Sequence, residues 1–240
     1  MSDLARRVAA ESLGSLLLTA VVIGSGVMGA QLAAGNAALA LLANTLATAA
    51  ILFVLITALA PISGAHFNPA VTLVALLRRD LTVGEAAAYA IAQCVGCVAG
   101  AILAHAMFAL PLVQIGATAR NGAAQLLSEG AATFALVFAI LATARVRPNA
   151  VAAAVALTIA AGYWWTASTS FANPAITLAR ALSDTFAGIR PQDAPAFVGA
   201  QFAGALVALA AFAWLYRDPA RAAQAVSTAA AARSVSSKAG

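Results

Sequence analysis

The chain has 240 residues, of which 63% are hydrophobic and 9% are charged, and its mean hydropathy is +0.93. This composition lies outside the range of soluble globular domains and predicts a protein that is mostly embedded in lipid. The net charge of +5 does not indicate a nucleic-acid-binding protein, because the basic residues are spread thinly between apolar runs and are not clustered with aromatic residues.

The apolar stretches come in two lengths. Six of them approach the ~20 residues that a helix needs to cross the hydrocarbon core; they cover 8–30, 38–60, 84–109, 123–144, 149–167 and 194–216. The first has no clear small-residue cleavage site, so we expect it to be retained as a helix. Two shorter segments, 68–77 and 173–182, would span about 15 Å as helices and can enter the membrane without crossing it.

The distribution of lysine and arginine predicts the orientation of these spans. An even number of spans places both termini on the same side of the membrane. The basic residues on that side are Arg6, Arg7, Arg78, Arg79, Arg145, Arg147, Arg217, Arg221, Arg233 and Lys238, whereas Arg120, Arg180 and Arg190 lie on the other side. Because basic loops stay inside, we expect cytoplasmic termini in a multi-pass protein of the cell (inner) membrane.

The chain also repeats itself. The segment His66–Leu73 is echoed by Phe171–Leu178, with the two asparagines 105 positions apart. Further matching pairs are Glu11 with Glu129 and Ala92-Gln93-Cys94-Val95-Gly96 with Ala200-Gln201-Phe202-Ala203-Gly204. Three spans and one half-helix per half predict two inverted repeats, over 1–115 and 116–216, around a path through the membrane midplane. The Ala- and Ser-rich segment 217–240 is predicted to be a flexible cytoplasmic tail.

The repeated Asn-Pro-Ala predicts the start of each half-helix. Asparagine caps a helix with its side-chain oxygen, and proline fits the next position because it has no N–H to leave unpaired. The carboxamide NH₂ remains able to donate, and each helix N-terminus carries roughly half a positive charge. A pore centre built in this way repels cations and binds the oxygen of a neutral solute. These motif residues are Asn68, Pro69, Ala70, Asn173, Pro174 and Ala175.

The stretch Ser63–Thr72, the second Asn-Pro-Ala and the paired glutamates resemble the aquaporin and aquaglyceroporin family over about residues 5–216. The resemblance implies an all-α membrane protein with six transmembrane helices and two re-entrant half-helices. It also implies a pore in each protomer, a homotetramer in the lipid bilayer, and passive passage of small neutral solutes without a cofactor. Glu11 and Glu129 would be buried and would accept hydrogen bonds from the re-entrant loops. No nucleophile or metal cluster accompanies them, so we expect no enzyme.

The chain departs from the family's pattern at the outward constriction. The family usually has arginine directly after the second Asn-Pro-Ala, where this chain has Ile176. Counting back without gaps from the asparagines places the other constriction positions at Thr48, Ala161 and Ser170. This ring of small or aliphatic side chains predicts a wide pore that offers two hydroxyl groups. Alternatively, a neighbouring aromatic residue fills the gap, namely Phe171, Trp164 or Trp165.

Several further residues leave two interpretations open. Arg180, four residues after Ile176, either places a charge in the outer vestibule or pairs with Asp184 at the surface. His66 either lines the cytoplasmic vestibule as a pH-sensitive group or makes structural hydrogen bonds. Cys94, Cys97 and His105 are interpreted as packing residues, and no metal site is predicted.

The solute is less well determined than the channel. The family's glycerol facilitators commonly have aspartate shortly after the second motif, whereas this chain has Thr177 and Leu178. The local pattern is similar to a bacterial branch associated with arsenic-resistance operons, which implies arsenous acid as a candidate besides water and glycerol. The alternatives are a water-selective channel and a coupled secondary transporter. The transporter is disfavoured because no titratable group is well placed at the midplane to carry a coupling ion.

Overall fold

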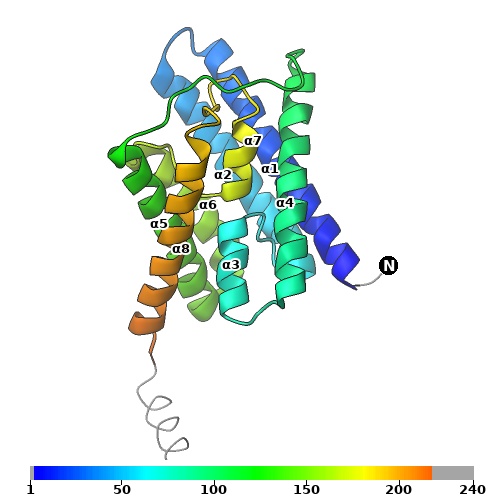
Figure 1. Cartoon of the computed structure of the whole chain (residues 1–240), viewed down its shortest axis with the longest axis vertical. Helices are drawn as coiled ribbons and strands as arrows, with labels where there is room; N and C mark the ends of the chain where they lie inside the picture. The colour runs from blue at the N-terminus through cyan, green and yellow to red at the C-terminus, as the bar shows by residue number, and fades with distance from the viewer. Residues whose placement is uncertain (1–2, 218–240) are drawn as a thin grey trace, which may run out of the picture.

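The structure is a computed structural model that describes residues 3–217, and these residues form a bundle of helices (Figure 1). The elements are α1 (Asp3–Leu32), α2 (Ala37–Ser63), α3 (Pro69–Leu77), α4 (Val83–Met107), α5 (Ala123–Val146), the 3₁₀ turn η1 (Pro148–Ala150), α6 (Val151–Trp165), α7 (Pro174–Arg180) and α8 (Ala194–Leu215). No strand occurs among these residues, so the predicted all-α class is confirmed. Residues 218–240 of the predicted tail lie outside the described range.

Five helices, α1, α2, α4, α5 and α8, are long and apolar enough to cross a membrane. The sixth predicted span, 149–167, differs from the expectation. Its helix α6 has only 15 residues, or about 22 Å, because η1 precedes it and the backbone becomes extended at Thr166. The sixth predicted span is therefore a short helix, which ends at Trp165 before the loop that leads to α7.

Local signals in the sequence explain where several helices begin. Asn36 caps α2 by accepting a hydrogen bond from the N–H of Leu39 at 3.1 Å. Thr82 and Glu85 form a capping box at the start of α4. The two short helices begin at a proline that follows an asparagine cap, as the repeated motif predicts.

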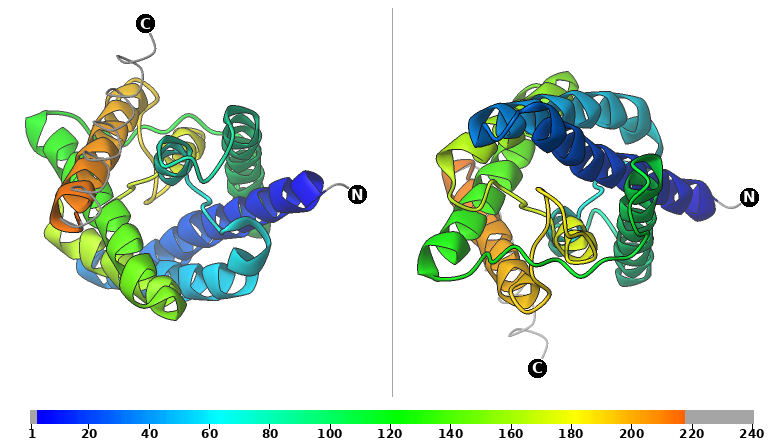
Figure 2. Two further views of the ribbon diagram at one scale, coloured as in Figure 1. Left: turned by 90° about the horizontal axis from the view of Figure 1, so that it is seen from below. Right: turned by 90° about the horizontal axis from the view of Figure 1, so that it is seen from above.

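The long helices surround α3 and α7, which point into the bundle from opposite ends (Figures 1 and 2). The start of α1 and the end of α8 lie at the end of the molecule that holds α3. Within each half, one helix pair packs closely through a glycine, α1 with α4 and α5 with α8. A Cβ at Gly96 would collide with the carbonyl oxygen of Ser12, and one at Gly204 with that of Gly130. Glycine is therefore required for both helix pairs to approach this closely.

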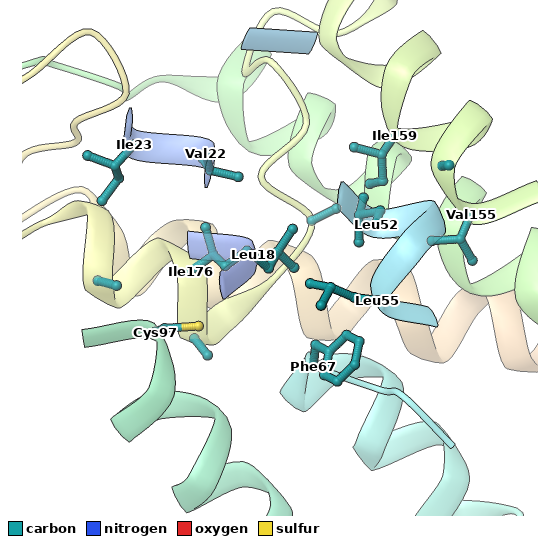
Figure 3. Packing of buried hydrophobic residues seen from close by; sticks show 14 of the residues in the cluster. Leu18, Val22, Ile23, Leu52, Leu55, Phe67, Cys97, Val155, Ile159 and Ile176 are labelled. Carbon is teal, nitrogen blue, oxygen red and sulfur yellow. The ribbon is translucent and has the colours of Figure 1, made fainter. Parts of the chain in front are cut away.

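The largest apolar cluster lies between α1, α2, α6 and the loops that precede α3 and α7 (Figure 3). Leu18, Val22, Leu52 and Ile159 belong to it, and the same side chains line the central cavity. The core of this protein is thus also the apolar wall of its pore, whereas large apolar side chains are exposed on the outside of the bundle. That arrangement suits a protein surrounded by lipid.

Candidate functional site: a central pore

The two asparagine caps hold the half-helices together at the centre of the molecule. The Oδ1 of Asn68 accepts a hydrogen bond from the N–H of Ala70 at 2.9 Å, and its Nδ2 donates to the carbonyl oxygen of Ala172 at 2.7 Å. Asn173 does the reverse: its Nδ2 donates to the carbonyl oxygen of Phe67 at 2.7 Å. Each carboxamide therefore donates one of its two N–H groups to the opposite loop. The second N–H group remains free to donate, and both residues line the cavity.

Two fully buried carboxylates support the loops that carry these caps. Glu11 on α1 accepts four hydrogen bonds, from the Ser63 hydroxyl, the N–H groups of His66 and Phe67, and the Gln93 amide, at 2.7–3.0 Å. Burial of a carboxylate is costly unless donors surround it, and these four occupy both oxygens. Glu11 thereby fixes the path of the first loop.

The equivalent carboxylate on α5, Glu129, accepts three hydrogen bonds. They come from the N–H groups of Phe171 and Ala172, both at 2.9 Å, and from the Gln201 amide at 2.6 Å. Gln201 also donates to the Thr177 hydroxyl at 2.8 Å, so it links the carboxylate to α7. Gln93 bridges Glu11 and α3 through Thr72 in the same way. The sequence alone assigned no role to these glutamines, although both recur in the repeated Ala-Gln-x-x-Gly stretches.

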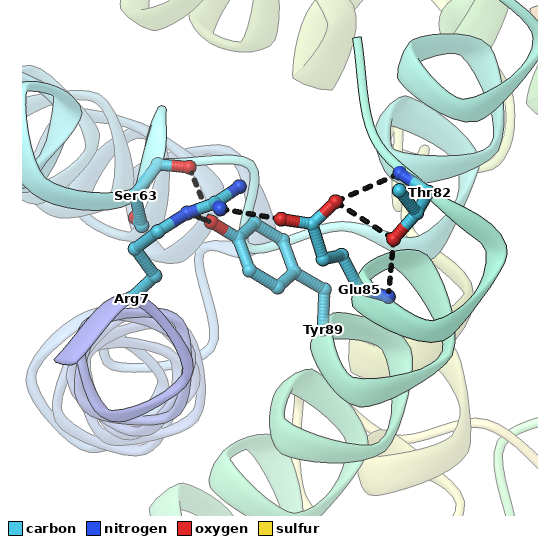
Figure 4. Close-up of polar contacts among 5 residues, drawn as sticks. All are labelled: Arg7, Ser63, Thr82, Glu85 and Tyr89. Atoms are coloured by element: carbon cyan, nitrogen blue, oxygen red, sulfur yellow. Dashed lines mark hydrogen bonds and ion pairs between the residues drawn. The ribbon is translucent and has the colours of Figure 1, made fainter. Parts of the chain in front are cut away.

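The first loop has an additional brace at the end of the molecule where α1 begins (Figure 4). The Tyr89 hydroxyl donates to the carbonyl oxygen of Ser63 at 2.8 Å and accepts from Nε of Arg7 at 2.9 Å. Arg7 also forms an ion pair with Glu85 at 2.7 Å. The brace connects α1, α4 and the end of α2, and its residues Arg7, Glu85 and Tyr89 lie outside the repeated motifs.

The cavity between the helices has a volume of about 840 Å³. Its wall extends from Arg78 and Arg145, at the end that holds α3, to Arg180 on α7. At the first end Arg78 pairs with Asp80 at 3.0 Å. Between the ends the wall is mostly apolar, interrupted by the two asparagines and a few hydroxyl groups, as expected of a path for small neutral molecules.

Three of the four predicted constriction residues, Thr48, Ser170 and Ile176, line this cavity, but Ala161 does not. The side chain of Ala161 is exposed on the outside of α6, so we correct the prediction at this position. The pore-facing residues of α6 are Val155, Ile159 and Tyr163, which recur every four residues, and position 161 lies on the opposite face.

Tyr163 is a cavity-lining residue of α6 that the count without gaps missed. Its hydroxyl lies 3.1 Å from the Oγ1 of Thr48, and both residues are buried. Thr48, Tyr163, Ser170 and Ile176 thus all line the cavity, and Tyr163 is aromatic. Of the aromatic residues considered as fillers, Trp164 and Trp165 are exposed and do not line the cavity, whereas Phe171 does.

Arg180 is buried in the cavity wall and does not form the predicted surface pair. Only 3% of the residue is exposed, and its guanidinium carbon lies 3.2 Å from the centroid of the Phe171 ring. Its Nε donates to the carbonyl oxygen of Ala187. Asp184 lies beyond the end of α7 and instead accepts a hydrogen bond from the N–H of Ala117 at 3.1 Å. The structure thus favours a charge that faces the pore.

The remaining polar candidates have structural partners. His66 lines the cavity, and its Nδ1 lies 3.1 Å from the Thr72 hydroxyl. His105 is fully buried; its Nδ1 lies 2.9 Å from the Leu112 carbonyl oxygen just after α4, and its Nε2 lies 2.9 Å from the Ser183 hydroxyl after α7. Cys94 and Cys97 are free thiols on α4. Within residues 3–217 no group of three or more His, Cys, Asp or Glu side chains is arranged to hold a metal ion.

Comparison with known proteins agrees with this geometry. Residues 1–151 match the family model described as major intrinsic protein. The chain is 56% identical over 219 residues to the aquaglyceroporin AqpS of Rhizobium meliloti (strain 1021), a match that covers 91% of this chain and 93% of that protein. Aquaporin-1 of Pongo abelii is 38% identical over 149 residues, 58% of this chain and 54% of that protein.

A solved structure has the same fold. The X-ray structure of the aquaglyceroporin from Plasmodium falciparum superimposes with a TM-score of 0.67, over 86% of this chain and 94% of that one. The two sequences are 19% identical over the match, so this likeness bears on the fold alone.

Proposed function

The chain belongs to the major intrinsic protein family, and on this premise we propose that its pore passes small neutral solutes that carry hydroxyl groups, together with water. The family consists of passive channels in membranes, and the chain is a multi-pass membrane channel for water and small solutes. Glycerol and arsenous acid, a neutral trihydroxide, are the solutes that we propose to test first.

The composition of the constriction carries this proposal. Thr48, Tyr163 and Ser170 bring three hydroxyl groups to the cavity wall, and Ile176 occupies the position that arginine usually holds. Hydroxyl groups exchange hydrogen bonds with a solute as donor and as acceptor, so they replace part of its hydration shell. An isoleucine beside them provides an apolar surface for the solute's carbon or arsenic side. The name of the similar AqpS, an aquaglyceroporin, supports the same class of solute.

Coupled transport fits the structure less well. Glu11 and Glu129 are the buried carboxylates of the spans, and every oxygen of both accepts at least one hydrogen bond from the protein. A carboxylate that supports a loop in this way is not available to bind and release a coupling ion. We therefore propose passive flux that rises linearly with the solute gradient.

We further propose the orientation and assembly that the sequence predicted. Cytoplasmic termini would place Arg78 and Arg145 at the inner mouth of the pore and Arg180 near the outer mouth. The repeats 1–115 and 116–216 each contribute one loop to the centre. The exposed apolar surface of the bundle would be shared between lipid and neighbouring protomers of a homotetramer in the inner membrane.

Stopped-flow light scattering on proteoliposomes tests the proposal. We expect fast entry of water, glycerol and arsenous acid with a low activation energy. Fast entry of water alone would mean that Tyr163 and Phe171 close the ring to larger solutes, and the chain would then be water-selective. Saturable uptake that depends on an ion gradient would instead indicate a coupled transporter.

The substitution Ile176→Arg tests the ring directly. An arginine at this position narrows the constriction, so we expect it to lower glycerol and arsenous acid flux by roughly tenfold and water flux much less. Ile176→Val is the matched control, because it keeps an apolar side chain of similar size and should leave both fluxes unchanged. An equal loss of water and solute flux in Ile176→Arg would contradict the proposed role of this position.

A further inference from the structure

We propose that Arg180 is the charged selectivity residue of the outward half of the pore, acting from one helical turn beyond Ile176. The inference rests on the proposed channel function and assigns a residue to the selection of its solutes. It concerns a cation fixed in the pore wall, whose charge opposes the entry of cations and whose free N–H groups bind the oxygens of passing solutes.

The position of the guanidinium is the first support. Arg180 is the last residue of α7, and its backbone lies four residues beyond Ile176 on the same face of the helix. Both side chains line the central cavity, as does Phe171. The pore wall therefore has no arginine directly after the second Asn-Pro-Ala but has one a helical turn later, at Arg180.

The second support is that the guanidinium is only partly satisfied by the protein. Its Nε donates to the Ala187 carbonyl oxygen. Among residues 3–217 no acceptor forms a hydrogen bond with its two terminal nitrogens. Neither nitrogen is completely enclosed by the protein. A buried charged group keeps unpaired donors only where water or a solute reaches them, so these N–H groups face the path of the solute.

The third support is that the guanidinium stacks on a fixed aromatic ring. The Phe171 ring lies under the Arg180 guanidinium, with 3.2 Å between the guanidinium carbon and the ring centroid. Phe171 is itself held by an edge contact with Phe197 and by the hydrogen bond from its N–H to Glu129. A guanidinium stacked on a fixed ring has few rotamers available, so its donors are preorganised for an oxygen acceptor.

A second arginine strengthens the positive field without touching the solute. The guanidinium carbon of Arg120 lies 4.9 Å from the centroid of the same Phe171 ring. It donates to the carbonyl oxygens of Gly188 and Ser168 at 2.9 and 3.3 Å and does not line the cavity. No ion pair within 4.0 Å neutralises either arginine in the described part of the chain. The outward half of the pore is thus more positive than the half-helix alone would make it.

Flux measurements on Arg180→Gln test the assignment. We expect the leak of protons and of potassium ions into proteoliposomes to rise by roughly tenfold or more. A unit positive charge at contact distance raises the energy barrier for a passing cation enough to slow its passage by more than about tenfold. The double variant Ile176→Arg/Arg180→Gln should return the leak to near the wild-type value. Arg190→Gln removes an arginine that pairs with Asp193 outside the cavity, and should leave the leak unchanged.

Arg180→Lys separates the charge from the fixed donors and serves if Arg180→Gln does not fold. Lysine keeps the charge but has no planar group to stack on Phe171, so cation exclusion should persist while the ratio of glycerol to water flux changes several-fold. A folded Arg180→Gln with wild-type leak, or an Arg180→Lys with a wild-type flux ratio, would overturn the assignment. Absence of solute flux in the wild type would instead refute the proposed function and not this residue's role in excluding cations.

Discussion

The two loops that lead into the half-helices, 63–68 and 168–173, follow the same backbone path with different side chains. Left-handed φ values occur at equivalent positions, at Gly64 (87°), Ala65 (52°) and Phe67 (49°) in the first loop and at Thr169 (61°), Ser170 (51°) and Ala172 (47°) in the second. Both then reach an extended asparagine, with φ of −154° at Asn68 and −151° at Asn173. The path is repeated because one buried carboxylate holds the loop backbone in each half.

The chemistry that the loops present to the pore is not repeated. At the position two residues before each asparagine, the first loop has His66, bonded to Thr72, whereas the second has Phe171, which carries Arg180. The duplicated backbone thus supplies the cross-linked centre, and single side-chain differences make the two mouths of the pore unlike. Substitutions in the shared support should therefore impair folding, whereas substitutions at the divergent positions should change selectivity.

The largest effect should follow removal of the supporting carboxylates. Glu11→Ala and Glu129→Ala each leave several buried donors without an acceptor, at about 1–3 kcal/mol per donor. We expect each to lower the free energy of unfolding by at least about 3 kcal/mol, and Glu11→Ala to lower it more, because Glu11 accepts four hydrogen bonds and Glu129 three. Denaturation in detergent micelles, followed by tryptophan fluorescence, measures both.

The matched control for this pair is Asp80→Ala. That carboxylate belongs to an exposed ion pair with Arg78, so its loss should cost no more than about 1 kcal/mol. If Glu129→Ala proved as destabilising as Glu11→Ala, the fourth hydrogen bond of Glu11 would add nothing to stability.

A smaller effect is expected where the paired helices cross. Gly204→Ala places a methyl group against the Gly130 carbonyl oxygen, and Gly96→Ala does the same against Ser12. We expect either change to lower the free energy of unfolding by about 1–3 kcal/mol, the usual cost of overpacking. Gly199→Ala is the control on the same helix as Gly204, because a Cβ there meets no neighbouring atom. Sensitivity of only one half, measured by the same denaturation assay, would show that the two crossings are packed differently.

The sequence predicted the shared features of the halves better than their differences. Asn-Pro is a local signal, so both half-helices begin at the proline that the motif indicates. The prediction that Ala161 lines the pore was wrong, because a count from Asn173 carries no information about which face of α6 is turned to the cavity. Tyr163 lines the cavity, whereas Ala161 is exposed on the opposite face.

The role of Arg180 illustrates a second limit of sequence analysis. The spacing to Asp184 predicts an ion pair only if the helix continues through both residues, but α7 ends at Arg180. The chain then turns, and residues distant in sequence decide which side chains meet. No local pattern encodes the tertiary contacts of Arg180, which are its stacking on Phe171, its hydrogen bond to the Ala187 carbonyl oxygen and its proximity to Arg120 across the same ring.

The smallest effect is expected at the loop position where one half has glycine and the other has a residue that is strained at a left-handed φ. Gly64 has a φ of 87°, which glycine adopts without cost, whereas the equivalent Thr169 is a β-branched residue at 61°. Thr169→Gly relieves about 1–2 kcal/mol of strain but adds freedom to the unfolded chain, so we expect a net gain in unfolding free energy of less than about 1 kcal/mol. The reciprocal Gly64→Thr introduces the strain and should cost about 1–2 kcal/mol.

Thr169→Gly acts on the backbone alone, because the Thr169 hydroxyl forms no hydrogen bond within residues 3–217. In Gly64→Thr, by contrast, the new Cβ would lie 3.3 Å from Nε2 of His66, which lines the cavity. If the shared path is set by the carboxylates, the two variants should shift the denaturation midpoint in opposite directions, and Thr169→Gly should leave the ratio of glycerol to water flux unchanged. A changed flux ratio in Thr169→Gly, with stability unaltered, would mean that the threonine positions Ser170 in the ring. Backbone support and solute selection would then be coupled in the second loop, and the separation between the repeated path and the divergent side chains would fail there.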